Sequence, residues 1–365
     1  MVNIGKRIYA SKKTTQNTKL LCILHPMNQP SVAVVLLNYN GLKWLQQFVP
    51  ILVQSTYTNL QIIVADNAST DASVAYLQTT QPQIKIISNP TNQGFAQGYN
   101  TALLQVQAQY YVLLNTDVAV MPNWLQPIIQ LMESDLTIGA CQPKILSYAQ
   151  PTHFEYAGAC GGYIDYLGYP LAKGRVFNTL EKDAGQYNGN HPVFWASGAA
   201  LVVRSNLYIQ LGGFDDYFFA HQEEIDFCWR LQLLGHKVYC CSSSVVYHVG
   251  GGTLQAGSPT KTMLNFRNNL IMLHKNLPAV DVKKIIIIRY WLNKIALIPL
   301  LLKGDITNAK AILQAHKQYK IWVTTHAAQQ NTSHNKTMNT LIGVVNKSIV
   351  MQYFILRKKT YTQIV

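Results

Sequence analysis

Three acidic side chains lie close together at the start of a predicted helix. Glu223, Glu224 and Asp226 begin a stretch, running to about residue 234, in which apolar residues recur at helical spacing. One or two acids would only compensate the positive end of the helix dipole. Three acids within four positions favour a site, where a carboxylate could act as general base toward an incoming hydroxyl group.

A second group of polar residues follows the predicted strand Tyr110–Leu114. Asn115 and Asp117 offer one amide and one carboxylate there. Mg²⁺ or Mn²⁺ takes one or two protein carboxylates and completes its shell with water and phosphate oxygens. The pair therefore suits a metal–diphosphate group better than a bare metal cage.

Asp66 ends another predicted strand and could accept hydrogen bonds from a nucleobase N–H or a ribose hydroxyl. A nucleotide-reading carboxylate, a metal–diphosphate clamp and a separate base together predict the transfer of a group from an activated nucleotide donor.

Alternating strands and helices are predicted to position these residues. The strands are expected at Val32–Leu37, Leu60–Ala65, Ile84–Ile87 and Tyr110–Leu114, and the helices between them at 42–55, 71–79 and 95–108. This alternation is typical of an open, mostly parallel α/β sheet, whose ligands bind beyond the carboxyl ends of the strands.

A polar cluster follows each of the four strands. The clusters are 38–41 with Asn38, 66–71 with Asp66 and Asn67, 89–94 with Asn92 and Gly94, and 115–117. One such cluster could be an ordinary turn, but four at the same sheet edge predict donor binding. The sequence holds neither GxGxxG nor GxxxxGK[ST], which disfavours dinucleotide and P-loop sites.

Two segments downstream extend the pattern. Ser197 and Gly198 form a predicted tight turn within an expected strand Trp195–Val203, and His248 follows the expected strand Val245–Tyr247. A single histidine in such a place is as often structural as functional.

The ordered set of motifs resembles the inverting family 2 glycosyltransferases of the GT-A fold, near their bacterial rhamnosyltransferase-like members. The resemblance covers roughly residues 31–260. Its motifs are Val34–Gly41, Val64–Asp71, Asn92–Asn100, Leu113–Asp117, Ser197–Ala200, Gly212–Asp215 and Glu223–Asp226 with Arg230.

The resemblance implies roles for individual residues. It implies base contact by Asp66, binding of a divalent cation (Mg²⁺ or Mn²⁺) and diphosphate by Asn115 and Asp117, and a possible metal ligand in His248. The family commonly has Asp where Asn115 stands, so a single carboxylate remains.

The acidic pair that supplies the family's catalytic base corresponds to Glu223 and Glu224. Glu224 is the expected base, with Glu223 as the alternative, and Asp226 is expected to orient the acceptor or the helix. Donor contacts are expected from Asn38, Asn67, Asn92, Gly94, Ser197 and Gly198. The implied reaction is a single displacement from a nucleotide-diphospho-sugar with inversion at the anomeric carbon.

Charge is distributed unevenly along the 365 residues, whose formal net charge is +14. Residues 1–19 carry five basic side chains and no acid, residues 20–260 nine basic and fourteen acidic ones, and residues 261–365 sixteen basic and two acidic ones. Because the surplus lies outside the central body, no nucleic-acid partner is expected, and the tail is predicted to meet an anionic membrane surface.

The most apolar stretch of that tail is residues 283–302, which polar residues and a proline interrupt. It is predicted to lie in the membrane interface, with Tyr290 and Trp291 at headgroup level, rather than to span the bilayer or pack on the body. A second such helix is expected over Ile342–Leu356. A lipid-linked saccharide acceptor at the cytoplasmic face, and peripheral attachment there, would suit this tail.

Three regions are therefore expected: a basic, unstructured leader (1–30), a GT-A catalytic domain (31–260) and a basic, amphipathic helical, membrane-associating region (261–365). The six cysteines show neither CxxC pairs nor spaced histidines, so they are expected to be reduced core residues rather than disulfides or a zinc site. Two alternatives stay open, a nucleotidyltransferase and a non-catalytic saccharide- or nucleic-acid-binding protein.

Overall fold

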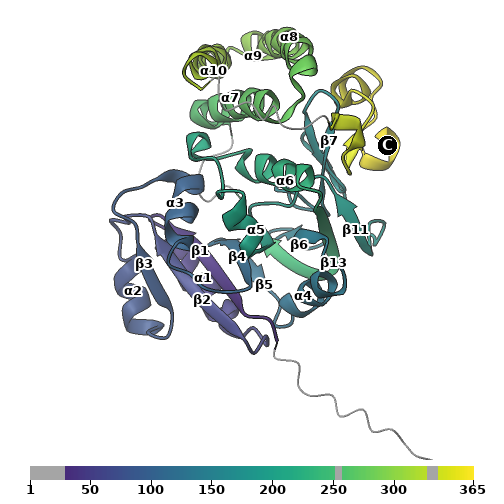
Figure 1. Cartoon of the computed structure of the whole chain (residues 1–365). Coiled ribbons are helices and arrows are strands. Elements are labelled where there is room, and N and C mark those ends of the chain that lie inside the picture. Colours follow the sequence, from purple (N-terminus) through teal and green to yellow (C-terminus); the bar gives the residue numbers. More distant parts are fainter. Residues whose placement is uncertain (1–28, 251–256, 327–335) are drawn as a thin grey trace, which may run out of the picture.

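The computed structural model describes residues 29–250, 257–326 and 336–365, so nearly all of the predicted leader lies outside the described residues. The first half alternates strands and helices as predicted. In chain order these are β1 (Val32–Asn38), α1 (Leu42–Leu52), β2 (Leu60–Asp66), α2 (Ser73–Thr80), β3 (Lys85–Ser88), α3 (Gly94–Leu103) and β4 (Tyr110–Asn115). The four strands are parallel, and helices cover the sheet (Figure 1).

The same sheet continues into the second half of the chain. It adds β5 (Val118–Val120), β6 (Ile138–Ser147), β11 (Asn190–Val193), β12 (Ala200–Arg204) and β13 (Lys237–His248). The order is β11-β13-β6-β12-β4-β1-β2-β3, with β5 beside β13. Strand β12 runs antiparallel to β4 and β6, and it begins only at Ala200 because the residues before it form the Ser197–Gly198 turn.

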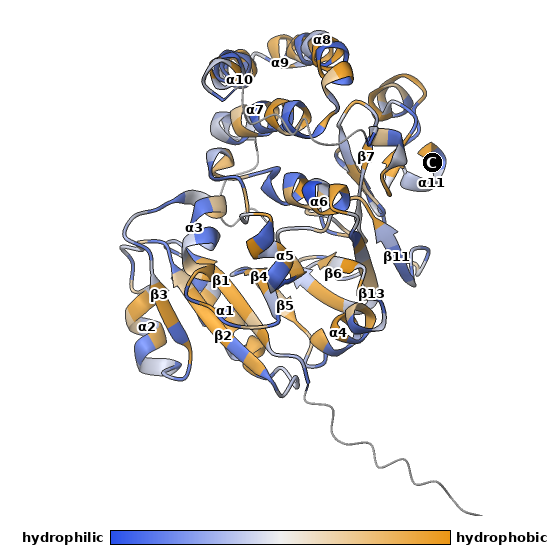
Figure 2. Cartoon of the chain, viewed as in Figure 1, coloured by the Kyte–Doolittle hydropathy of each residue, from blue (hydrophilic) through white to orange (hydrophobic). Residues whose placement is uncertain are grey.

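Strand register brings the polar clusters to one edge. Asn38 stands opposite Asp66, and Leu37 stands opposite Asn115, so the carboxyl ends of β1, β2 and β4 meet there. Residues 32–36 of β1 are all buried, as expected for a strand covered on both faces. In Figure 2 this part of the sheet is largely hydrophobic.

A smaller sheet lies beside the large one. Its strands are β7 (Gly162–Asp165), β8 (Pro170–Ala172), β9 (Arg175–Val176), β10 (Thr179–Leu180) and β14 (Val344–Val345), in the order β10-β9-β8-β7-β14. The C-terminal segment thus supplies an edge strand parallel to β7.

The prediction of an amphipathic helix over Ile342–Leu356 is wrong. The stretch holds β14 and one short π-helical turn, Met351–Ile355. Val345 and Ile349 are buried in the main core. Their apolar side chains therefore serve packing and strand pairing instead of a membrane-facing stripe.

The remaining helices are α4 (Leu125–Ser134), α5 (Ser205–Gln210), α6 (Glu223–Leu233), α7 (Pro259–Asn276), α8 (Ala279–Ile295), α9 (Leu297–Leu302), α10 (Ile306–Thr325) and α11 (Tyr361–Ile364), with 3₁₀ turns η1 (Asp216–Phe218) and η3 (Met338–Thr340). Helix α7 packs between α6 and α10, and α8, α9 and α10 form the layer farthest from the large sheet (Figure 1).

The predicted apolar stretch 283–302 is helical. Residues Ala279–Leu302 form the one stretch in the described part of the chain that is long and apolar enough to cross a membrane, by length and composition only. Two of its polar side chains point into the protein. Arg289 is 3% exposed and donates to the carbonyl of Leu167 at 2.9 Å, and Asn293 is fully buried.

Candidate active site

The clusters after β1 and β2 are joined by a network around Asp66. The Asn38 side-chain amide donates to Asp66 Oδ1 and to Ser69 Oγ, both at 3.0 Å, and the Ser69 backbone N–H donates to Asp66 Oδ2 at 3.0 Å. Asp66 is only 4% exposed. Each carboxylate oxygen can accept a second hydrogen bond, so Asp66 is held rigidly and keeps acceptor capacity.

Asn67 ties the next two loops together. Its amide donates to Asn92 Oδ1 and to the carbonyl of Gly94, both at 3.0 Å, while its Oδ1 accepts from the Asn89 amide at 3.1 Å. The structure thus brings the predicted residues Asn67, Asn92 and Gly94 together. Both N–H donors of the Asn67 side-chain amide are used in hydrogen bonds to protein acceptors, so Asn67 serves to hold these loops together.

Gly94 touches the loop that leads to the acidic helix. Its φ is +74°, and a Cβ there would lie 2.4 Å from the Phe219 ring, so only glycine fits. The next residue, Phe95, donates its backbone N–H to the carbonyl of Phe219 at 2.6 Å. The loop 89–94, where donor contacts are expected, is therefore in direct contact with the loop before α6.

Asp117 and His248 form the second centre. Pairing of β5 with β13 sets Val118 opposite His248, and Asp117 Oδ1 lies 3.1 Å from His248 Nε2. Asn115 Nδ2 lies 3.5 Å from the same nitrogen. All three predicted residues of this centre are brought together.

Glu155 joins this centre and was not predicted. Its Oε2 lies 3.0 Å from His248 Nδ1, so the imidazole sits between two carboxylates. Gly250 allows this approach, because a Cβ there would lie 2.8 Å from Glu155 Oε1. No sequence motif contains Glu155. The single hint was an acidic residue in an otherwise apolar and glycine-rich segment.

The ionisation of this centre follows from its contacts. Burial alone would lower the pKa of His248, but Asp117 and Glu155 raise it to about 10. Burial alone would raise the pKa of Asp117, but the hydrogen bond and charge of His248, together with the backbone N–H groups of Asp117 and Gly250, lower it. A carboxylate oxygen beside an imidazole nitrogen is a donor set that divalent first-row metals accept, and a bound cation would replace the proton on His248 Nε2, so these residues fit a divalent cation.

Glu223 and Glu224 begin α6. Glu223 is 4% exposed and Glu224 is partly exposed, yet each has a buried Oε2 for which the described residues offer no hydrogen-bond partner. Burial and the neighbouring Glu224 raise the pKa of Glu223 well above its usual range, and burial raises the pKa of Glu224 to about 7. Buried, unpartnered carboxylates with raised pKa values are typical of catalytic acids and bases.

The Ser197–Gly198 turn connects the pair with the end of β4, which carries Asn115. A Cβ on Gly198 would lie 3.7 Å from Glu224 Cβ. The next residue, Ala199, accepts the backbone N–H of Asn115 at 3.0 Å. Ser197 is fixed by its own N–H, which donates to Gln142 at 2.9 Å. Glu224 therefore lies on the side of the sheet where β4 ends.

Asp226 occupies a different environment. It is fully buried, and its oxygens accept from Arg230 Nε at 2.8 Å and Asn276 Nδ2 at 2.7 Å, with Lys275 3.3 Å away. Burial would raise its pKa, but Lys275 and Arg230 lower it. These contacts fit the helix-orienting alternative of the two predicted roles, since both oxygens are engaged with α6 and α7.

Helix α7 holds the loop before α6. Asn268 Nδ2 lies within hydrogen-bond distance of three of its carbonyls, at 2.9 Å from Phe218 and Ala220 and 2.8 Å from His221. The loop needs such support because Phe219, His221 and Gln222 all have positive φ. Asn268 was not predicted, because it lies in the region assigned to membrane association.

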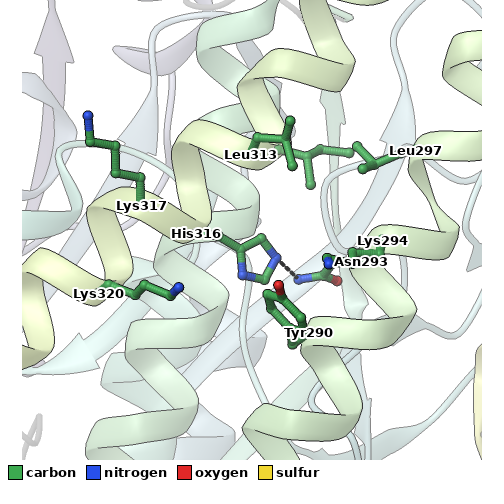
Figure 3. Close-up of a pocket in the computed structure, with 9 residues that line it drawn as sticks. Tyr290, Asn293, Lys294, Leu297, Leu313, His316, Lys317 and Lys320 are labelled. Atoms are coloured by element: carbon green, nitrogen blue, oxygen red, sulfur yellow. Dashed lines mark hydrogen bonds between the residues drawn. The ribbon is translucent and has the colours of Figure 1, made fainter.

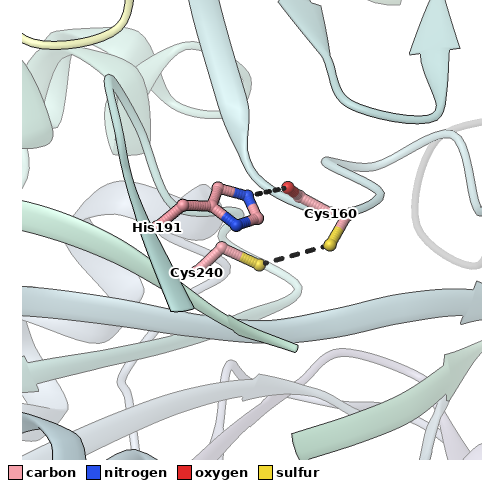
Figure 4. A group of neighbouring side chains, drawn as sticks. All are labelled: Cys160, His191 and Cys240. Carbon is pink, nitrogen blue, oxygen red and sulfur yellow. Dashed lines mark hydrogen bonds between the residues drawn. The ribbon is translucent and has the colours of Figure 1, made fainter. Parts of the chain in front are cut away.

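Cys160, His191 and Cys240 form a separate cluster whose potential ligand atoms lie within 4.8 Å of one another (Figure 4). The two His191 ring nitrogens each lie 3.1 Å from a backbone carbonyl, and the Cys160 thiol donates to the carbonyl of Tyr187. These contacts favour protein packing over metal binding. The five cysteines of the described chain are free and buried.

Comparison with protein families and with other protein sequences gives consistent matches. The model of Glycosyl transferase family 2 matches residues 33–196. An uncharacterized glycosyltransferase of Haemophilus influenzae is 31% identical over 267 residues, which are 71% of this chain and 78% of that protein. The N-acetylglucosaminyl-diphospho-decaprenol L-rhamnosyltransferase of Mycobacterium tuberculosis is 25% identical over 239 residues, 60% of this chain and 76% of that protein.

Solved structures share the fold. GalNAc-T7 with UDP, GalNAc and Mn²⁺ gives a TM-score of 0.55 at 17% identity, covering 84% of this chain and 58% of the GalNAc-T7 chain. Residues 1–349 of S. aureus TarS with UDP-GlcNAc give 0.53 at 13% identity, covering 78% and 81%. The chain thus spans less than two thirds of GalNAc-T7, and at these identities the likeness concerns the fold alone.

Proposed function

This chain belongs to glycosyltransferase family 2 and is a glycosyltransferase with the GT-A fold, and from that premise we propose that it transfers a sugar from a nucleotide-diphosphate donor to a saccharide acceptor with inversion. The observation that carries the proposal is the pair Glu223–Glu224, whose buried Oε2 atoms have no hydrogen-bond partner in the described part of the chain, beside the Ser197–Gly198 turn and next to the end of β4. Such an arrangement sets a base beside the expected position of the sugar.

Glu224 is the proposed general base. The acceptor oxygen forms a bond to the anomeric carbon while the bond from that carbon to the diphosphate oxygen breaks, and the hydroxyl proton passes to Glu224. Its pKa of about 7 suits this task near neutral pH. Burial and the neighbouring Glu224 both raise the pKa of Glu223, so we propose that the pair carries a single negative charge, on Glu224.

A divalent cation is part of the proposal. Asp117 and His248 would hold it, and Asn115 would stand beside it. When bound, the cation would neutralise negative charge that develops on the leaving diphosphate. The imidazole ligand favours Mn²⁺ over Mg²⁺, which prefers oxygen ligands alone. Asp66 and Asn38, at the ends of β2 and β1, are the proposed contacts to the nucleoside.

The acceptor is proposed to be a lipid-linked saccharide at the cytoplasmic face of the cell membrane, within cell-surface polysaccharide synthesis. The name of the mycobacterial relative specifies a decaprenol-linked substrate. Helices α8 and α9 expose Trp291 (59%), Ile298 (55%) and Leu302 (84%). Because Arg289 and Asn293 are buried on the opposite side, we propose that these helices lie on the membrane rather than cross it.

The first experiment is a thermal-shift panel of UDP-, dTDP- and GDP-sugars with and without Mn²⁺ or Mg²⁺, followed by donor hydrolysis in the absence of acceptor. Binding should raise the midpoint of unfolding, and the donor that binds should be cleaved slowly to the nucleoside diphosphate and free sugar. Cleavage between the two phosphates would instead indicate nucleotidyl transfer. Binding without any turnover, even with acceptor extracts, would indicate a non-catalytic protein.

A further inference from the structure

A cavity of about 250 Å³ lies between α8 and α10 (Figure 3). Its wall combines three lysines with apolar and neutral polar side chains and no carboxylate. The lining residues are Tyr290, Asn293, Lys294, Leu297, Ile312, Leu313, His316, Lys317 and Lys320.

The three lysines are exposed and form no ion pair within the described residues. Lys294 comes from α8, whereas Lys317 and Lys320 come from α10, so two helices place positive charge along the wall of one cavity. In Figure 3 Lys320 extends toward His316, whereas Lys317 extends away from it. Lys294 Nζ lies 4.6 Å from the centre of the Tyr290 ring, which keeps it near the cavity wall. Such a concentration of charge favours an anionic ligand.

The cavity also contains an unpartnered polar atom. Asn293 is fully buried, its amide nitrogen lies 3.2 Å from His316 Nε2, and its Oδ1 has no hydrogen-bond donor among the described residues. Burial, together with Arg289, Lys320 and Lys294, lowers the pKa of His316 to about 4, so the ring is neutral. A ligand hydroxyl could therefore satisfy Oδ1, since a buried acceptor without a donor is costly.

Apolar side chains surround the opening. Leu313 on α10 is 52% exposed, and Ile298 on α9 is 55% exposed. Trp291 on α8 is also exposed, and its ring centre lies 5.2 Å from Lys294 Nζ. Lysines alone would suit any polyanion, but a nucleic acid would leave these apolar side chains in water, whereas lipid chains would cover them.

We propose that this cavity binds the phosphate headgroup of an anionic membrane phospholipid, with Lys294, Lys317 and Lys320 around the phosphate and Asn293 Oδ1 accepting a headgroup hydroxyl. This inference rests on the membrane attachment in the proposed function and specifies the lipid chemistry of that attachment. The acyl chains would run along the apolar surface of α9.

The test is flotation of the full chain with vesicles at physiological salt. The vesicles are phosphatidylcholine alone, phosphatidylcholine with phosphatidylglycerol, and phosphatidylcholine with oleate added to the same surface charge. The chain should prefer phosphatidylglycerol. Lys294→Gln/Lys317→Gln/Lys320→Gln should weaken that binding about a hundredfold, given about 1 kcal/mol for each lysine near an anionic surface.

Two further variants distinguish binding in the cavity from general electrostatic attraction to the anionic membrane. Lys43→Gln/Lys85→Gln/Lys182→Gln removes the same charge from exposed positions on the body and should leave flotation almost unchanged. Leu313→Trp keeps the lysines but fills the cavity, and should abolish the preference for phosphatidylglycerol over oleate.

Equal binding to both anionic vesicles by the unmodified chain, or an unchanged preference in Leu313→Trp, would overturn the headgroup site but leave membrane attachment standing. Failure to bind any vesicle would overturn both, and binding to single-stranded DNA alone would identify a nucleic-acid surface.

Discussion

At the scale of single residues, the two adjacent glutamates at the start of α6 have different environments. Glu223 is almost completely buried, whereas Glu224 is partly exposed beside Gly198. When two neighbouring carboxyl groups interact, their pKa values move apart, and the group whose ionisation costs less free energy loses its proton first. Glu224, the more exposed of the two, is therefore the proposed position of the negative charge and of contact with the acceptor.

Replacing Glu224 by glutamine should lower turnover by about 10²–10⁴ while donor binding persists, because the amide cannot accept the proton. In the unmodified enzyme, kcat/KM should rise with pH through about 7, since the base works only when deprotonated. Steady-state rates over a pH series and donor-induced thermal shifts measure both effects. Glu223→Gln serves as the matched control and should keep most of the activity. A Glu224→Gln enzyme with a normal rate would assign the base elsewhere.

Glu155 should matter for the metal through His248. A carboxylate at Nδ1 orients the ring and leaves Nε2 to bind the cation, and loss of such a partner typically weakens metal affinity about 10- to 100-fold. Glu155→Gln should therefore bind Mn²⁺ more weakly, as measured by electron paramagnetic resonance of free Mn²⁺. Glu133→Gln, on the distant helix α4, is the control and should bind Mn²⁺ normally. Equal affinity in all three proteins would leave Glu155 a purely structural role.

Whether each of these residues could be predicted depended on whether the sequence around it has a recognisable pattern. Asp66 and Asn115 end their strands and Asp117 lies two residues beyond β4, so sequence position alone implied their location. Glu155 is brought to His248 from a separate segment, and such a contact has no local signature. Asp226 shares a helix start with the glutamates, but its orientation on the helix turns it toward α7, which spacing alone did not distinguish.

At the scale of elements, α7 extends the site beyond the region that the motifs cover. Its Asn268 holds three carbonyls of a loop with several positive φ angles. The loop sets the direction in which α6 begins, and α6 carries the proposed base, Glu224.

Asn268→Ala should cost about 1–3 kcal/mol of stability, because buried carbonyls lose their donor. It should also lower kcat roughly 10- to 100-fold, since a base displaced by a fraction of an ångström is poorly aligned. Donor affinity should stay unchanged, because the donor-side residues are untouched. Gln314→Ala, at an exposed position on α10, controls for general helix effects. Activity equal to that of the control would show that the loop keeps its shape without Asn268.

Strands were easier to predict than the C-terminal segment. The buried parallel strands are continuous apolar runs, and the alternation of strand and helix implied their order. The stretch Ile342–Leu356 has a similar composition to an amphipathic helix, but pairing of β14 with β7 and burial of Ile349 decided its conformation. Such tertiary contacts override local preference.

At the scale of the whole molecule, the C-terminal region combines an outer helical layer with a segment that completes the core. Ile349 and Ile364 are fully buried, and Lys336 donates to carbonyls at the end of α6. Deletion of residues 279–365 would therefore remove core residues and could not test membrane attachment cleanly.

Substitution of exposed apolar residues is the cleaner test. Trp291→Ser/Ile298→Ser/Leu302→Ser should release the protein from membranes, with at least about tenfold weaker vesicle binding, because apolar area no longer enters the lipid. The midpoint of thermal unfolding should change little, since all three side chains are exposed. Leu104→Ser, at an 87% exposed position on the body, is the control. A triple variant that still sediments with membranes would contradict the attachment.

The contact between Gly94 and Phe219 constrains how this enzyme can diverge. Backbone hydrogen bonds from Phe95 and Ala96 to the carbonyl of Phe219 link a loop expected to meet the donor with the loop that leads to the proposed base. Mutations that reshape the first loop to accommodate a new sugar would also shift the second. Evolution of donor preference would therefore proceed more readily through positions outside this junction, and relatives with different donors should still have glycine there.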